Sequence, residues 1–409
     1  MKPKSSNNTK EFMKEWRKRK MIPKQWQAAT EVINIIEQAG FEAFIVGGAV
    51  RDYYLKKENN DVDIATSALP NEIQEIFNHT IDVGIEHGTV IVLDCGEPIE
   101  VTTFRTESTY SDHRRPDAVH FVRSLTEDLK RRDFTMNAMA LNKDGDFIDY
   151  YSGRKDIDNR IIRAVGNPDE RFREDALRMI RAIRFAAQLG FSIEPVTFQA
   201  VLQQSSSISF IAMERIQVEF SKIWISNNAR IAIDYIQQTG LERFLPGKFA
   251  ISDWQYFNGG NRQVGWAYFC FVNDREISLL TQYKCSNKDK LFAKLVFDAY
   301  DRLLDGWQSM DYFTFDLDIL KTALHFAQWQ SKQLTITFDD IAIKKNELPI
   351  QTRQQLAITG NDVIVWLDKK GGPWIKPVLD AALDAVVTGQ VANDKQQLKE
   401  WFHAFNDEG

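Results

Sequence analysis

The sequence is poor in cysteine and histidine, with three and six residues respectively among 409. Cys95, Cys270 and Cys285 lie too far apart in the sequence to suggest a disulfide framework or a zinc site. The histidines do not cluster, and because no His-Asp dipeptide occurs, a metal phosphohydrolase module is not expected. This cysteine usage indicates a reducing, cytoplasmic location.

Long apolar runs are also missing. No stretch approaches the roughly 18 apolar residues of a membrane span, so we expect no membrane partner. The first twenty residues are polar and basic and lack the apolar centre of a signal peptide. Hydrophobic residues still make up 44% of the chain, which is enough for packed cores. Because 409 residues exceed what one core normally supports, two or more domains are expected.

The chain has no excess of positive charge. Its formal net charge is −6, which argues against a protein that coats nucleic acid indiscriminately. Arginines are concentrated between Arg105 and Arg184, whereas residues 301–409 carry 11 basic and 16 acidic residues. Any polyanion is therefore expected to bind toward the N-terminal half.

A glycine pair follows a short apolar run at residues 44–52 (FIVGGAVRD). The run predicts a buried strand that ends at the glycines, and glycine lets backbone N–H groups approach a ligand closely. If a helix begins near Ala49, its positive end and Arg51 would favour an anion such as a triphosphate. The alternative is an ordinary glycine turn.

Two carboxylates follow, at Asp61 and Asp63. Residues two apart on a strand point to one face, and paired hard oxygen ligands suit Mg²⁺ when phosphates complete its shell. Glu100, on the polar face of a predicted strand, is either a third metal-site carboxylate or an exposed glutamate. A phosphate-binding turn beside a carboxylate pair indicates phosphoryl or nucleotidyl transfer, and a solvated Asp-x-Asp is the alternative.

Helix and strand patterns alternate up to about residue 150, and almost continuous helix follows from about Glu170. We expect a first helix over 26–40, ending at Gly40, and a polar, mobile loop over 105–118. The aromatic residues between Trp254 and Phe271 are expected to pack in cores rather than stack on bases. Strands are expected at 43–46, 62–65, 83–84, 89–94 and 99–104, and later helices at 173–189, 214–226, 229–239, 264–272, 286–304, 316–331, 352–358, 361–369, 374–388 and 394–405.

Two further segments, residues 131–138 (RRDFTMNA) and 174–186 (EDALRMIRAIRFA), complete an ordered set of four motifs. Together with GGAVRD and DVD they closely resemble the bacterial class II tRNA nucleotidyltransferases, the CCA-adding enzymes. The resemblance is strong from about residue 22 to 225. Residues 356–362 (LAITGND) and 372–374 (GPW) are similar to the tail of the family's bacterial dimeric branch, which implies a homodimer.

The resemblance implies an α+β fold, in which a nucleotidyltransferase head with a small mixed β-sheet precedes an all-helical neck, body and tail. It implies Mg²⁺ as cofactor, tRNA as partner, and CTP and ATP as substrates. The expected parts are a basic N-terminal extension (1–21), a catalytic head (22–160), a neck that selects the nucleotide (161–226), a body (227–305) and a tail that contacts tRNA (306–409).

The family's functional residues carry over to the matching positions of this sequence. Asp61 and Asp63 correspond to its catalytic metal ligands, and Gly48 and Arg51 to its triphosphate contacts. Its nucleotide contacts correspond to Arg132, Asp175, Arg178, Arg181 and Arg184.

Asp175 and Arg178 are three apart on the expected helix and would lie side by side. Cytosine and adenine both present an amino donor beside a ring-nitrogen acceptor, which a carboxylate and a guanidinium complement. Guanine and uracil present the reverse pattern and would leave buried groups unpaired. The pair would thus select C and A without a template strand. The alternative is an i,i+3 salt bridge in the first turn of the helix.

Four neighbouring residues leave more than one role open. Arg181 and Arg184 follow Arg178 at intervals of three residues and could hold nucleotide phosphates or support the selecting pair. The alternative is that they are solvated or paired with Glu170 and Glu174. Asp133 and Asn137 could hydrogen-bond a ribose hydroxyl, or satisfy the local backbone instead.

The motifs favour template-independent addition of C, C and A to the 3′ end of tRNA, with release of pyrophosphate. A CC-adding enzyme usually has a shortened or altered loop, whereas residues 105–118 look complete. A bacterial poly(A) polymerase typically has a basic C-terminal extension, and a non-catalytic RNA-binding relative would have lost Asp61 and Asp63. We expect the loop to matter more for A addition than for C addition, because one pocket must change size.

Overall fold

The computed structural model describes residues 23–407, apart from residues 60, 85, 87 and 108–118. The chain forms two compact units, Met1–Phe249 and Ala250–Gly409. This boundary falls inside the segment that we predicted as the body, and the finer division into head, neck, body and tail remains a prediction. Within the described part of the chain, no helix has the length and apolar character that crossing a membrane requires.

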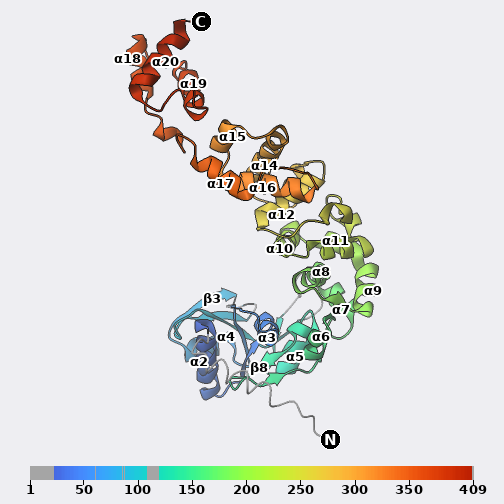
Figure 1. Ribbon diagram of the computed structural model, residues 1–409. Coiled ribbons are helices and arrows are strands. Elements are labelled where there is room, and N and C mark those ends of the chain that lie inside the picture. The colour runs from blue at the N-terminus through green and yellow to red at the C-terminus, as the bar shows by residue number, and fades with distance from the viewer. Residues whose placement is uncertain (1–22, 60, 85, 87, 108–118, 408–409) are drawn as a thin grey trace. The chain divides into compact units, whose positions relative to one another are not determined.

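A seven-stranded mixed sheet lies in the first unit, with the order β3-β4-β5-β2-β1-β8-β9 (Figure 1). β2 and β5 are parallel, and the other neighbours are antiparallel. Four predicted strands agree closely with β1, β2, β4 and β5, while β3 begins earlier than predicted. The strands are β1 (Ala43–Val46), β2 (Asp63–Thr66), β3 (Thr80–Gly84), β4 (Thr89–Val92), β5 (Ile99–Thr103), β8 (Ala140–Leu141) and β9 (Phe147–Ile148).

Helices cover the sheet with their apolar sides. α2 (Lys24–Gln38) packs against β1, β2 and β5, and the chain leaves it through Gly40, whose φ of 91° explains the glycine there. α3 (Gly48–Tyr54) follows β1 directly, and α4 (Pro70–Ile76) packs against α2 and β4. The predicted end of the first helix is thus confirmed.

The face of the sheet that carries the carboxylates packs against α5 (Leu125–Lys130). Val46 and Ala65 form a buried cluster there with Leu125 and Leu129. Because strand side chains alternate between faces, Asp63 shares the face of Ala65. The carboxylate of Asp63 therefore projects from a packed, rigid layer.

The segment that we predicted as a loop at 105–118 is partly a strand, so that prediction was wrong at its start. β6 (Arg105–Glu107) pairs with β7 (Val119–Phe121) as a separate two-stranded ribbon. The backbone pairing with residues 119–121, far along the chain, is not visible in local composition. Residues 108–118 lie outside the described residues.

The helix predicted at 173–189 is interrupted in the structure. α7 (Pro168–Glu174) ends before Asp175, which is extended with φ −142° and ψ 104°, and α8 (Leu177–Leu189) begins after it. The Asp175 carboxylate accepts the N–H of Leu177 at 3.1 Å, a local bond from side chain to backbone at the break between the two helices.

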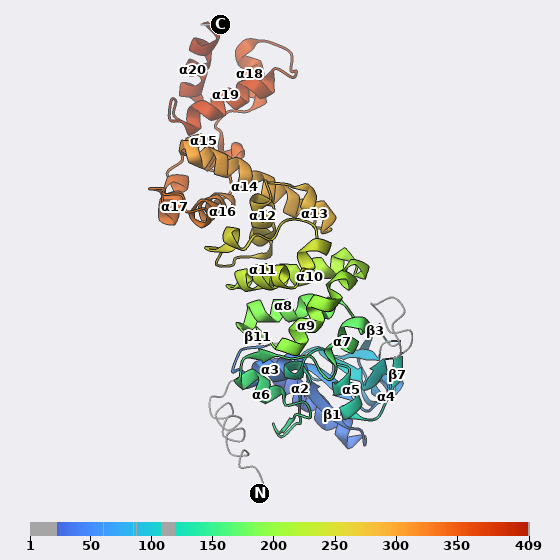
Figure 2. The same ribbon diagram turned by 90° about the vertical axis from the view of Figure 1, so that its right-hand side faces the viewer.

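The remainder of the first unit is mainly helical, and α8 lies beside α10 and α11 (Figure 2). One exception to the expected all-helical neck is a parallel pair of two-residue strands, β10 and β11. The elements are η2 (Thr135–Asn137), α6 (Gly153–Asp158), β10 (Ile161–Ile162), β11 (Ser192–Ile193), α9 (Pro195–Gln204), η3 (Ser205–Phe210), α10 (Met213–Trp224), α11 (Ala229–Gln238) and η4 (Leu241–Phe244).

The described part of the second unit is helical. A capping box of Ser286 and Asp289 begins α14, whereas residues 352–358, predicted as a helix, form only a single 3-10 turn. The aromatic side chains pack in the core as expected, except that Tyr256 is 53% exposed. The elements are η5 (Ile251–Trp254), α12 (Arg262–Val272), α13 (Ser278–Gln282), α14 (Asn287–Asp305), α15 (Ser309–Thr314), α16 (Leu317–Trp329), α17 (Phe338–Asn346), η6 (Arg353–Gln355), α18 (Gly360–Leu367), α19 (Ile375–Val387) and α20 (Lys395–Asp407).

Gly153 packs so tightly against the backbone carbonyl of Thr135 that an added Cβ would overlap it. We expect Gly153→Ala to lower the free energy of unfolding by about 3 kcal/mol, because backbone must shift to make room. As a control, Gly96→Ala meets open space and only a strained φ of 87°, so it should cost about 1 kcal/mol. Urea denaturation of both variants gives the comparison, and equal losses would contradict the packing argument.

Candidate active site

The pairing of β1 with β2 joins the glycine turn to the carboxylates. Val46, the last residue of β1, lies opposite Asp63, the first residue of β2. The chain then turns at Gly47, whose φ is 71°, and α3 begins at Gly48. The helix predicted near Ala49 is thus confirmed. The glycine turn and the carboxylates lie at the same end of the β1–β2 pair.

The carboxylates crowd one another at this edge. Asp63 is partly buried, Asp61 is exposed, and Glu100 lies beside Asp63 in the parallel pairing of β2 with β5. Burial and then the negative charges of Glu100 and Asp61 raise the pKa of Asp63 to about 6, although the positive charge of Arg132 opposes the shift. Among the residues that the structure describes, no group of three or more His, Cys, Asp or Glu is arranged to hold a metal ion.

Asn59 ties the glycine turn to the carboxylate strand. Its side-chain amide donates to Asp52 at 2.8 Å, and its carbonyl oxygen accepts the backbone N–H of Asp61 at 2.8 Å. Asp52 in turn accepts two hydrogen bonds from Arg51, both at 2.9 Å. The two motifs are therefore held at a fixed separation by polar contacts as well as by strand pairing.

Arg132 is held against the glycine turn by a buried acid. Its Nε and Nη2 donate to Asp128, which is fully buried and also accepts from Arg131. Burial alone would raise the pKa of Asp128, but the charges of Arg132 and Arg131 outweigh it and the pKa is lowered. A Cβ on Gly47 would lie 3.1 Å from Nη1 of Arg132, so the missing side chain makes room for the guanidinium.

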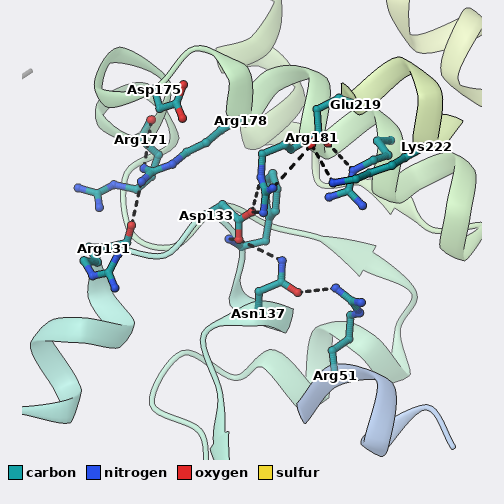
Figure 3. A network of polar contacts seen from close by, with 12 residues as sticks. Arg51, Arg131, Asp133, Asn137, Arg171, Asp175, Arg178, Arg181, Glu219 and Lys222 are labelled. Atoms are coloured by element: carbon teal, nitrogen blue, oxygen red, sulfur yellow. Dashed lines mark hydrogen bonds and ion pairs between the residues drawn. The ribbon is translucent and has the colours of Figure 1, made fainter. Parts of the chain in front are cut away.

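A chain of polar contacts runs from α3 to α8 (Figure 3). Arg51 donates to the Asn137 carbonyl oxygen at 2.7 Å, Asn137 donates to Asp133 at 3.0 Å, and Asp133 accepts from Arg181 at 2.9 Å. Burial would raise the pKa of the Asp133 carboxyl, but the Arg181 charge and these hydrogen bonds hold it well below its usual range. Asp133 also accepts the N–H of Phe134, the local backbone contact that was one of its predicted alternatives.

Glu219 of α10 extends this chain to the next helix. It accepts from Nε of Arg184 at 2.5 Å and lies 3.9 Å from Nη1 of Arg181 and 3.4 Å from Nζ of Lys222. In the described part of the chain, neither Arg181 nor Arg184 pairs with Glu170 or Glu174. The prediction of those two partners is therefore wrong. The two arginines are buried or half-buried between acids rather than solvated.

Asp175 and Arg178 lie at the junction of α7 and α8, and each side chain bonds to other partners, so the alternative of an i,i+3 salt bridge between them is wrong. Arg215 of α10 donates to both carboxylate oxygens of Asp175, at 3.2 and 2.7 Å. Arg178 donates to Glu174 at 2.6 Å and to the backbone carbonyls of Arg171 and Arg131 at 3.3 and 2.9 Å. No side-chain bond joins the two among the described residues, because the chain leaves the helical path at Asp175.

Four residues of this site were not found from the sequence. Asp128 precedes Arg131 and Arg132 by three and four residues, a helical spacing that could have pointed to it. Arg215 and Glu219 reach the site from α10, far along the chain, and no local pattern identifies them or Asn59.

The chain is similar to known proteins over most of its length. Residues 43–163 match the poly A polymerase head domain, residues 190–249 the RNA and SrmB-binding site of polymerase A, and residues 260–402 the tRNA nucleotidyltransferase domain 2. A CCA-adding enzyme of Geobacillus sp. (strain WCH70) is 41% identical over 92% of this chain and 96% of its own. The chain belongs to the CCA-adding enzymes.

Other members of the family agree with this assignment. A CCA-adding enzyme of Bacillus cereus (strain ATCC 10987 / NRS 248) is 40% identical over 94% of this chain and 99% of its own. The crystal structure of the Bacillus stearothermophilus CCA-adding enzyme in complex with CTP is 39% identical, covers 95% of this chain and 99% of its own, and superposes with a TM-score of 0.85. The expected fold and the tRNA nucleotidyltransferase class are thus confirmed.

The low pKa of Asp133 gives a prediction for acid stability. Because folding lowers this pKa, the stabilisation is complete above about pH 5 and is lost as the pH falls below the unfolded value of about 4. Asp133→Asn should cost about 3 kcal/mol at pH 7, since Arg181 loses its carboxylate. Urea denaturation at pH 7 and at about pH 3, below the unfolded value, should show a smaller acid loss for the variant, and parallel losses would contradict the assignment.

Proposed function

We propose that this chain adds C, C and A in succession to the 3′ end of tRNA, taking CTP and ATP without a template and releasing pyrophosphate. The observation that carries the proposal is the β1–β2 pairing, which places a glycine turn beside two aspartates. The similarity to an enzyme crystallised with CTP supports the choice of nucleotide.

Asp61 and Asp63 fit a divalent cation: burial, and then the charges of Glu100 and Asp61, raise the pKa of Asp63, and a bound cation would stabilise the ionised carboxylates there. Mg²⁺ suits oxygen donors of this kind, with nucleotide phosphates completing the coordination. Two such ions are proposed: when bound, one would lower the pKa of the tRNA 3′-hydroxyl and the other would neutralise the leaving pyrophosphate. Glu100 contributes to the negative field from the neighbouring strand.

The triphosphate is proposed to lie along the turn at Gly48, with Arg51 and Arg132 beside it. Both guanidinium groups are already oriented by acids, Asp52 and Asp128, so little side-chain entropy is lost when a nucleotide binds. The net charge of the whole chain is −6 and does not attract a polyanion. The attraction is therefore supplied by these local arginines.

Base selection is proposed to rest on Asp175 and Arg178. The Arg215 clamp fixes the Asp175 carboxylate plane but leaves further lone pairs for an amino group of cytosine or adenine. Arg178 uses three of its five N–H groups on protein acceptors, which fixes its direction while others serve the ring nitrogen. Arg181 and Arg184 are proposed to support this pair and the nucleotide from the same helix.

We also propose that the helical C-terminal part contacts tRNA and that the enzyme acts as a cytoplasmic homodimer. The three cysteines are free thiols, which is compatible with a reducing environment. Size-exclusion chromatography with light scattering tests the dimer.

The deciding experiment is incubation with tRNA that lacks its 3′ CCA, with CTP and ATP separately and together. We expect two added residues with CTP alone and three with both. Arrest after two residues with both nucleotides would indicate a CC-adding enzyme, and long adenosine ladders would indicate a poly(A) polymerase.

Loss of either aspartate should abolish turnover. Asp61→Asn and Asp63→Asn should reduce kcat by at least about a thousandfold, because transition-state charge is no longer stabilised. Affinity for tRNA should change little, since phosphate contacts elsewhere hold it. Asp144→Asn, an exposed carboxylate on the same unit, is the matched control and should stay active. Near-normal incorporation by the two site variants would sink the metal assignment.

Loss of the base-selecting pair should change which nucleotide is added. Asp175→Ala and Arg178→Ala should raise incorporation of UTP or GTP relative to CTP and ATP, because half of the edge complement is removed. Arg215→Ala should have the same effect to a smaller degree, since the carboxylate stays but loses its orientation. Single-nucleotide competition assays provide the measurement. A slower reaction with unchanged discrimination would show that the pair is structural.

A further inference from the structure

Phe185 of α8 lies at the centre of the site without any polar group of its own. Its side chain is 4% exposed and packs edge-on against Phe134, with ring centroids 5.8 Å apart and planes at 85°. Phe134 belongs to the RRDFT segment. The ring therefore links the nucleotide-selecting helix to a second motif through purely apolar contact.

Three arginines surround this ring. The guanidinium carbon of Arg184 lies 3.7 Å from the ring centroid, that of Arg51 lies 5.0 Å away, and that of Arg181 lies 5.7 Å away. All three distances are within the range of cation–π attraction. Arg51 comes from α3 and the other two from α8, so one ring is shared by cations from both halves of the site.

An aromatic ring at position 185 interacts with the three arginines differently from a carboxylate. A carboxylate at this position would accept further N–H groups from the arginines, whereas the ring face attracts the cations without accepting any of their N–H groups. An aliphatic side chain of similar size would fill the space but supply no attraction. Asp133 accepts a hydrogen bond from Arg181, and Glu219 accepts one from Arg184.

We propose that Phe185 is a positioning residue that sets the spacing of Arg51, Arg181 and Arg184 for nucleotide binding. This inference rests on the proposed function, in which these three arginines face the nucleotide. Through these arginines, the Phe185 ring connects α3, which follows the glycine turn, with α8, which is proposed to select the base.

The test is Phe185→Leu, compared with Phe77→Leu as a matched control. Phe77 is also 4% exposed and lies in the same unit, but it has no part in the site. Both variants should lose similar thermal stability. Only Phe185→Leu should raise the KM for CTP and for ATP, by about tenfold, with a smaller change in kcat and an unchanged KM for tRNA.

Stepwise fluorination of the Phe185 ring separates attraction from packing, and it remains usable if the leucine variant does not fold. Fluorine withdraws electron density from the ring face with little change in shape, so the nucleotide KM should rise with each added fluorine. A constant KM across the series, or equal effects of the two leucine variants, would overturn the proposal. An unmodified enzyme that fails to add CCA would instead overturn the proposed function.

Discussion

The antiparallel pairing of β1 with β2 is the constraint on which the site depends. It places Val46 opposite Asp63, so the end of β1 lies beside the start of β2. Because strand side chains alternate, a slip of one residue would turn Asp63 to the opposite face and separate it from the glycine turn. The buried cluster between this sheet face and α5 makes that slip costly. Hydrophobic packing thus fixes the position of Asp63 relative to the glycine turn.

Around this edge, positive and negative side chains alternate in a connected network. Asp128, Asp133 and Glu219 each hold at least one arginine that is proposed to serve the nucleotide. These acids are buried, and a buried carboxylate is tolerated because the neighbouring guanidinium groups outweigh the cost of desolvation. The arrangement explains how a chain with a net charge of −6 keeps several arginines close together in one unit.

The sequence predicts well what depends on local pattern. Strands β1, β2, β4 and β5 and the start of α3 follow from the apolar runs, residue alternation and glycine position. The break at Asp175 was missed because a local bond from its side chain to the backbone overrides a continuous helical pattern. The partners of Asp175 and of Arg184 come from α10, some 35 to 40 residues away, and only the tertiary fold brings them into contact.

The main-chain acceptors of Arg178 have a consequence for how this enzyme tolerates sequence drift. The guanidinium donates to the backbone carbonyls of Arg171 and Arg131, groups that every amino acid carries. Substitutions at those two positions therefore leave two of its anchoring acceptors chemically intact, provided that the backbone path is kept. Genetic screens for altered nucleotide choice should accordingly recover changes at Arg178 or Glu174 more readily than changes at the residues that supply the carbonyls.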